Sequence, residues 1–173
     1  DGQVLTSTGT VWQSEAAVAG GTTHASIWRI TSAFNTSSAG ITANWEENDE
    51  QYGYQTIGAS MTESSGVFTF PTTGYWNIDF RTYAYRDSAR PYARARIYVV
   101  ENFGSGDSWE NVAASQQGIP VIGTYHVHAS LSARYIFDVT DTATHKTQFH
   151  VSSHSGVSNQ PAYWEGDGNV NFT

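Results

Sequence analysis

Residues 66–80 read GVFTFPTTGYWNIDF, and this stretch decides the fold. Aromatic and β-branched residues, which favour strands, stand on both sides of Pro71 and Gly74. Proline cannot donate to a strand ladder, and glycine allows backbone conformations that other residues avoid. We therefore expect a strand over 66–70 that turns sharply into a second strand over 74–86, with the apolar faces of the two strands matched.

Alternating apolar and polar residues predict which face of each long strand is buried, because successive side chains of a strand point to opposite sides. In 74–86 the apolar set, which we assign to the core, is Trp76, Ile78, Phe80 and Ala84. The same alternation recurs in 92–101, with Ala93, Ala95, Ile97 and Val99. It recurs again in 125–139, with Val127, Ala129, Leu131, Ala133, Tyr135 and Phe137.

The rest of the chain carries shorter segments of the same kind, and no window has the spacing of an amphipathic helix. Further strands are expected at 27–34, 66–70 and 146–152 and at 169–173, with weaker ones near 41–45, 55–61 and 109–115. About eight to ten short antiparallel strands predict an all-β, double-sheet jelly roll. Residues 1–25 are small and polar, without sustained periodicity, and are expected to form an N-terminal arm or anchor before a globular domain over 26–173.

Composition narrows the functional classes. The 173 residues fit one domain, and the formal charge of −8 disfavours nucleic acid as a partner, because such binding relies on Lys and Arg. The chain has no cysteine, so it has neither disulfides nor a thiolate zinc site. No apolar run is long enough for a membrane span, and the first residues lack the pattern of a signal peptide.

The quoted stretch resembles the central signature of the tumour-necrosis-factor (TNF) and complement globular-head superfamily. That signature is Gly-x-Phe-x-x-Pro-x-x-Gly-x-aromatic-x-aromatic, and five positions fall on it: Gly66, Phe68, Pro71, Gly74 and Trp76. The resemblance covers roughly residues 26–173 and implies a TNF-like jelly-roll sandwich. It also implies a homotrimer, in which one sheet face of each subunit is buried against two neighbours.

A second resemblance concerns tailed-phage fibre and head-decoration proteins. It rests on three segments, which are residues 28–32, 52–54 and 61–66. It implies a virion structural and adhesion module, a homotrimeric knob of a fibre or capsid decoration that binds a host-surface glycan or protein. In that setting the N-terminal arm would contact other virion proteins. The alternative is a secreted or cell-surface trimeric ligand or lectin of the same fold.

The six histidines raise the question of a metal site. His126 and His128 are two apart on a predicted strand, so they project from the same face. In the TNF-like resemblance this strand lies in the sheet that faces the threefold axis, where three copies would offer six imidazoles to a transition metal. The alternative is two polar residues on a half-exposed sheet face. No other cofactor is expected.

The acidic run at 46–50 suggests calcium, whose ligands are carboxylate oxygens, but it lacks the Asp-x-Asp-x-Asp-Gly order of a preorganised loop. A solvated loop is the favoured interpretation. The sequence also has no Gly-x-Ser-x-Gly elbow and no compact nucleophile–base motif, so we expect no enzyme activity.

Aromatic residues in predicted loops are the candidates for partner binding. They stand beside Gly, Ser and Asn, a mixture that combines contact area with adaptable hydrogen bonds. The candidates are Tyr52, Tyr54, Tyr92, Trp109, Tyr163 and Trp164. The alternative for each of them is a core residue beneath a loop.

Overall fold

The computed structural model describes residues 3–7, 12–16, 21–49, 56–86, 90–106, 108–120, 127–154 and 162–167. These residues form fourteen strands and include no helix, so the described chain is all-β as predicted. All the strand pairs are antiparallel. Because no described segment is helical, none of them is a helix long and apolar enough to cross a membrane.

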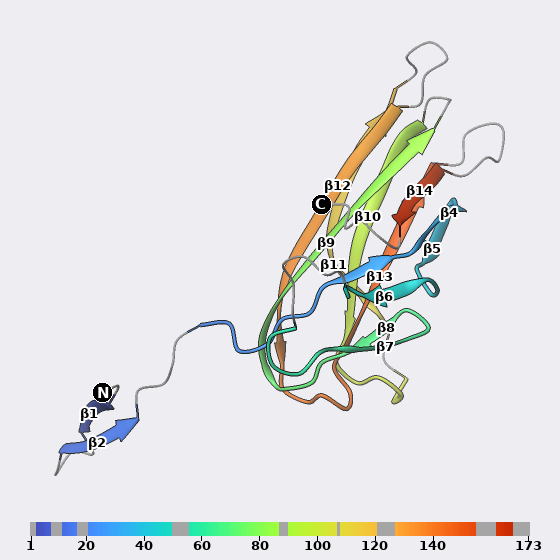
Figure 1. Ribbon diagram of the computed structural model, residues 1–173. Helices are drawn as coiled ribbons and strands as arrows, with labels where there is room; N and C mark the ends of the chain where they lie inside the picture. Colours follow the sequence, from blue (N-terminus) through green and yellow to red (C-terminus); the bar gives the residue numbers. More distant parts are fainter. Residues whose placement is uncertain are drawn as a thin grey trace.

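Two sheets pack face to face around the core (Figure 1). The first sheet joins β12 (Val127–Val139), β9 (Gly74–Arg86), β14 (Ala162–Asp167) and β4 (Ser32–Thr36), in that order. The second joins β11 (Glu110–Ile119), β10 (Arg90–Val100), β13 (Lys146–Ser153), β8 (Val67–Thr69) and β7 (Thr62–Ser64), while β5 (Ser38–Gly40) also pairs with β13. Two small sheets pair β3 (Trp28–Ile30) with β6 (Trp45–Glu47), and β1 (Gln3–Ser7) with β2 (Trp12–Ala16).

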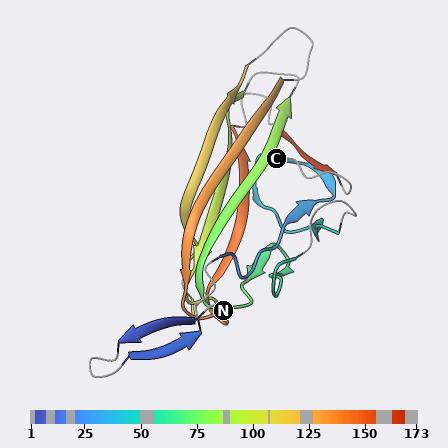
Figure 2. The same cartoon turned by 60° about the vertical axis from the view of Figure 1, so that its left-hand side comes forward.

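The order in which the chain visits the sheets is that of a jelly roll. From β8 onward the chain crosses from one sheet to the other at every connection except the hairpin between β10 and β11. The first crossing is the turn after Pro71, between β8 and β9. Figure 2 shows the long strands running side by side, with the short strands β3, β6, β7 and β8 to one side.

The predicted strand faces are confirmed. The register of β9 on β12 runs without interruption from Gly74 opposite Val139 to Arg86 opposite Val127. The residues assigned to the core that are buried are Ile78, Phe80, Ala84, Ala93, Ala95, Ile97, Val99, Ala129, Leu131, Ala133 and Phe137. Trp76, Val127 and Tyr135 are half-buried and pack at the edge of this core.

The chain turns between β8 and β9 as the sequence of residues 66–80 predicts. The structure also shows why a glycine is needed at position 66, which the sequence pattern did not reveal. Phe68 and Phe70 are both 1% exposed: Phe70 belongs to the main core, and Phe68 packs edge-on against the Trp45 ring. Gly66 has a φ of 83°, and a Cβ at this position would lie 2.3 Å from the carbonyl oxygen of Ile41. Gly66 is therefore required both by its backbone conformation and by the close approach of the 41–42 backbone.

Several expected strands differ from the observed ones. The single strand expected at 27–34 is two strands, β3 and β4, which belong to different sheets. The strand expected at 41–45 is wrong: β5 ends at Gly40, β6 begins at Trp45, and Asn44 between them has a φ of 63°. The segment 55–61 contributes only an isolated bridge at Ile57 among its described residues. The strand expected at 169–173 lies outside the described residues, and β7 and β14 were not expected.

The N-terminal segment, for which the sequence predicted no strand, holds a hairpin. β1 and β2 pair from Gln3 opposite Ala16 to Ser7 opposite Trp12. Five-residue strands with few large apolar residues give too short an alternation to be recognised in a sequence. In Figure 1 this hairpin lies apart from the two large sheets.

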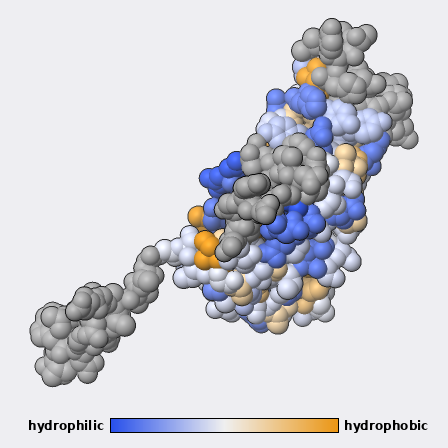
Figure 3. Space-filling view, viewed as in Figure 1, coloured by the Kyte–Doolittle hydropathy of each residue, from blue (hydrophilic) through white to orange (hydrophobic). Residues whose placement is uncertain are grey.

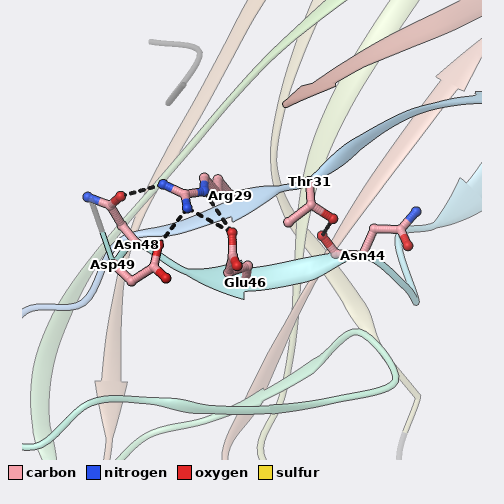
Figure 4. Close-up of polar contacts among 6 residues, drawn as sticks. All are labelled: Arg29, Thr31, Asn44, Glu46, Asn48 and Asp49. Atoms are coloured by element: carbon pink, nitrogen blue, oxygen red, sulfur yellow. Dashed lines mark hydrogen bonds and ion pairs between the residues drawn. The ribbon is translucent and has the colours of Figure 1, made fainter. Parts of the chain in front are cut away.

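A buried arginine fastens β3 to β6 (Figure 4). The Arg29 side chain is 4% exposed, and its Nε and Nη2 donate to one Glu46 oxygen at 2.9 and 2.8 Å. Nη2 also donates to Asp49 Oδ1 at 2.7 Å, and Nη1 donates to Asn48 Oδ1 at 2.7 Å. Burial by itself lowers the pKa of Arg29, but the hydrogen bonds and charges of Glu46 and Asp49 outweigh it and raise the pKa above its ordinary value.

These contacts correct both interpretations of the acidic run at 46–50. Its described carboxylates are neither arranged as a calcium loop nor merely solvated. Glu46 and Asp49 hold Arg29, while Glu47 accepts hydrogen bonds from the hydroxyls of Thr56, at 2.7 Å, and Ser60. The run therefore ties two neighbouring segments to β6.

Candidate interaction face

One face of the β12–β9–β14–β4 sheet packs on the core, and the other carries large side chains on the surface. Tyr75 is 79% exposed and Ile136 is 65% exposed, although neither side chain is charged. The two are diagonal neighbours, because Tyr75 pairs with Asp138 and Ile136 pairs with Asn77. Figure 3 shows mainly hydrophilic colours on the described surface, with small separate apolar areas. An exposed aromatic–aliphatic pair on this sheet face is a candidate contact with another molecule.

The middle of this face carries a compensated charge cluster. Asp79 Oδ2 lies 2.6 Å from Nη2 of Arg134 and 3.2 Å from Nη2 of Arg81. Burial alone would raise the pKa of Asp79, but hydrogen bonds from the two arginines and their charges lower it. Because these charges are already paired, covering them with another protein surface is less unfavourable than covering isolated charges.

The far end of the face is aromatic. The Tyr85 ring stacks on His128, with ring centroids 5.3 Å apart, and on Tyr163, with centroids 5.2 Å apart. His128 Nδ1 also lies 3.8 Å from a carboxylate oxygen of Glu165. The face therefore has an apolar end, a paired-charge centre and an aromatic end.

Sequence comparisons find no relatives: no protein-family model matches the chain, and no curated protein has a significant sequence match. Solved structures do match. A crystal structure of murine APRIL at pH 5.0 has a TM-score of 0.50 and 7% identity, covering 82% of this chain and 97% of APRIL. A structure of murine APRIL at pH 8.5 has a TM-score of 0.46 and 8% identity, covering 80% of this chain and 96% of APRIL. APRIL is a TNF-family jelly-roll ligand. This chain has a TNF-like jelly-roll fold.

The TNF-like fold separates the predicted binding aromatics. Tyr163 is 39% exposed on the sheet face, and Tyr92 and Trp109 are half-buried. Trp164 is 0% exposed, and its Nε1 donates to the carbonyl oxygen of Thr36 at 3.2 Å. The prediction that Trp164 contacts a partner is therefore wrong, because its side chain belongs to the core.

Two of the predicted binding residues, Tyr52 and Tyr54, lie outside the described residues. The structure also adds candidates that the loop-based prediction missed, namely Ile136 and Tyr85, which stand within long strands. The sequence did contain a signal for them, because both residues fall on the polar, outward-facing side of strands whose other side was predicted to be buried.

The predicted histidine pair is only half described. His126 lies outside the described residues, and the side chain of His128 is 53% exposed. Within the described ranges, no three His, Cys, Asp or Glu groups are placed to hold a metal ion. The axial metal, which needs His126 and three subunits, stays a prediction.

The outer face of the second sheet contains His150, whose pKa is lowered. The His150 ring lies 4.3 Å from the Tyr98 ring, centroid to centroid, and over Gly40, where a Cβ would approach its Nε2 to 3.1 Å. Burial, and then the charge of Arg96, lower the pKa of His150 below its ordinary value of 6.5. The neutral imidazole is thus favoured in the folded chain.

This displacement predicts a loss of stability in acid. Below about pH 6.5 the unfolded chain gains a proton at His150 that the folded chain resists, so the free energy of unfolding decreases as pH falls. The variant His150→Gln should lose less stability between about pH 7 and 5.5 than the wild type. Urea unfolding across this range measures the slope, and His154→Gln, at an exposed position just after the same strand, is the control. Equal slopes for the wild type and His150→Gln would contradict the assignment.

Proposed function

We propose that this chain is a non-catalytic binding module that assembles as a homotrimer through the exposed face of the β12–β9–β14–β4 sheet. The observation that carries the proposal is the exposure of Tyr75 and Ile136, which are diagonal neighbours on that face. The paired charges of Asp79 and the aromatic end add polar and aromatic contacts of the kind found in interfaces. The TNF-like fold, and the trimer implied by the resemblance of the sequence to that superfamily, agree with this arrangement.

The setting of the module remains a prediction from the sequence. A fibre knob or capsid decoration of a phage, held by the N-terminal arm and bound to a host-surface glycan or protein, is the finer form of the proposal. A secreted or cell-surface trimeric ligand or lectin is the alternative. Both forms require a trimer that presents its other surfaces to a partner.

Sedimentation equilibrium tests the assembly. We expect a mass three times the 18.9 kDa of one chain at micromolar concentration. Ile136→Lys should give a folded monomer, because it places a charge in the proposed interface while replacing a side chain that is exposed in the single chain. Ile57→Lys is the matched control, because it makes the same change at a position that is 46% exposed and lies outside the four strands of this sheet.

A monomeric wild type, or a trimer that Ile136→Lys leaves intact, would contradict the proposed interface. Far-ultraviolet circular dichroism of each variant shows whether the strands persist. A change of mass in Ile57→Lys as well would mean that added positive charge, rather than the position of Ile136, causes dissociation.

A further inference from the structure

We propose that Arg94 and Arg96, on the outer face of β10, bind the carboxylate of an acidic sugar at the end of a glycan. This inference rests on the proposed function, because it names a ligand class for the binding module. The two arginines stand two residues apart on one face of the strand, about 7 Å from each other along the chain. The site is built by a single subunit, so it can be tested whether or not the trimer forms.

The first argument is the charge environment of these two arginines. Three other arginines whose side chains are described form ion pairs: Arg29 with Glu46 and Asp49, and Arg81 and Arg134 with Asp79. Arg94 and Arg96 are hydrogen-bonded only to neutral groups within the described residues. Two adjacent arginines whose described partners are all neutral leave two positive charges that a bound anion would pair.

The second argument is that neutral neighbours already hold the first guanidinium in place. Arg94 Nε donates to Gln116 Oε1 at 2.9 Å, and Nη2 donates to the same oxygen. The guanidinium carbon also lies 4.9 Å from the centre of the Tyr92 ring. A guanidinium held in this way loses little conformational entropy when it binds, and its Nη1 has no partner among the described residues.

The second guanidinium is held from the opposite side. Arg96 Nη2 donates to Ser152 Oγ at 3.0 Å, and Nη1 donates to the Tyr98 hydroxyl at 3.3 Å. The Tyr98 ring in turn packs on His150, whose ring occupies the space left free by Gly40. Arg96 Nε and His150 Nε2 are buried without a partner in the described structure, on residues that pair directly across the two strands. A buried polar atom without a hydrogen-bond partner is energetically unfavourable. The contact between Arg96 and His150 therefore has unmet hydrogen-bonding capacity.

The third argument concerns which anion fits. The net negative charge of the chain opposes a long polyanion, whereas a compact ligand feels mainly the two nearby arginines, because charges beyond about 8 Å are screened at physiological salt. Two neutral side chains beside the arginines, the exposed Gln116 and the half-buried Tyr98, suit the hydroxyls of a sugar. Among the side chains that the structure describes, none of the exposed large hydrophobic ones lies on β10 or β13, so this surface offers an acidic peptide little apolar anchorage.

Saturation-transfer NMR with sialyllactose, and with lactose as the neutral counterpart, tests the site. We expect the wild type to bind sialyllactose and to bind lactose at least about tenfold more weakly, since a charged hydrogen bond contributes this much or more. The double variant Arg94→Gln/Arg96→Gln should lose the preference for sialyllactose over lactose. Arg94→Lys, which keeps the charge but not the bidentate fork, should retain part of it. Gln117→Ala, an exposed substitution in neighbouring β11, should bind like the wild type.

Equal binding of the two sugars, or sialyllactose binding that survives in the double glutamine variant, would overturn the inference. Tighter binding of heparin or of tetraglutamate than of sialyllactose would overturn the choice of a compact acidic sugar. The monomeric Ile136→Lys chain should bind sialyllactose as the wild type does. A wild-type trimer without sugar preference would therefore refute this site alone, and a monomer with sugar preference would refute the trimer alone.

Discussion

Replacing Trp164 with alanine should destabilise the folded chain by about 3–5 kcal/mol, the range for truncating a large buried aromatic side chain. Trp164 is 0% exposed, belongs to the main core and is hydrogen-bonded to Thr36 through its indole nitrogen. The substitution opens a cavity and also leaves the Thr36 carbonyl without this donor. Urea unfolding at a fixed protein concentration measures the change.

Trp109→Ala is the matched control for this experiment. It makes the same chemical change at a half-buried position outside the main core cluster, where the centroid of the indole lies 5.9 Å from the centroid of the Phe103 ring. Its effect should be at most about 1–2 kcal/mol, because less apolar area leaves the interior. Equal losses for the two variants would show that β14 does not carry Trp164 into the core.

The second large effect should come from leaving Arg29 buried without its anions. Glu46→Gln/Asp49→Asn should reduce the free energy of unfolding by about 3 kcal/mol or more, because an uncompensated charge then remains inside. Arg29→Met should be milder, about 1–3 kcal/mol. The carboxylates that it leaves behind are 38% and 74% exposed, so water can solvate them.

The order of these two effects is the decisive result. Glu101→Gln, which neutralises an exposed carboxylate, controls for the change of net charge and should have little effect. If Arg29→Met is the more damaging change, the packing of the arginine stem, rather than its charge, fastens β3 to β6.

The sequence predicted the long strands because an alternation of period two over thirteen residues has no other common explanation. The face assignments of 74–86 and 125–139 are correct for this reason. The three-residue strands such as β3, β6 and β7 contain barely one alternation, and their pairing depends on partners elsewhere in the chain. The resemblance to the TNF and complement superfamily supplied the topology, which composition alone does not specify.

The candidate sites depended more on tertiary context. Tyr163 and Trp164 are adjacent aromatics, and the sequence proposed both as binding residues. Successive strand residues point to opposite sides, so one is exposed and the other buried, and only the pairing of β14 with β9 decides which. Likewise, the alternation placed Arg94 and Arg96 on an outer face, but their lack of carboxylate partners became evident only with the structure.

The crossing of the chain between the sheets also has a consequence for how the protein is made. β14 (Ala162–Asp167) follows all the other described strands in the sequence, joins β4 to β9 and carries Trp164 into the core. During synthesis, the first sheet therefore cannot close until β14 has left the ribosome, and β4 has to wait for a partner strand more than a hundred residues further along the sequence. Domains with such distant pairings fold in about milliseconds to seconds, slowly for their size. Until then the nascent chain exposes unpaired strand edges, and this is the stage at which neighbouring chains can pair wrongly.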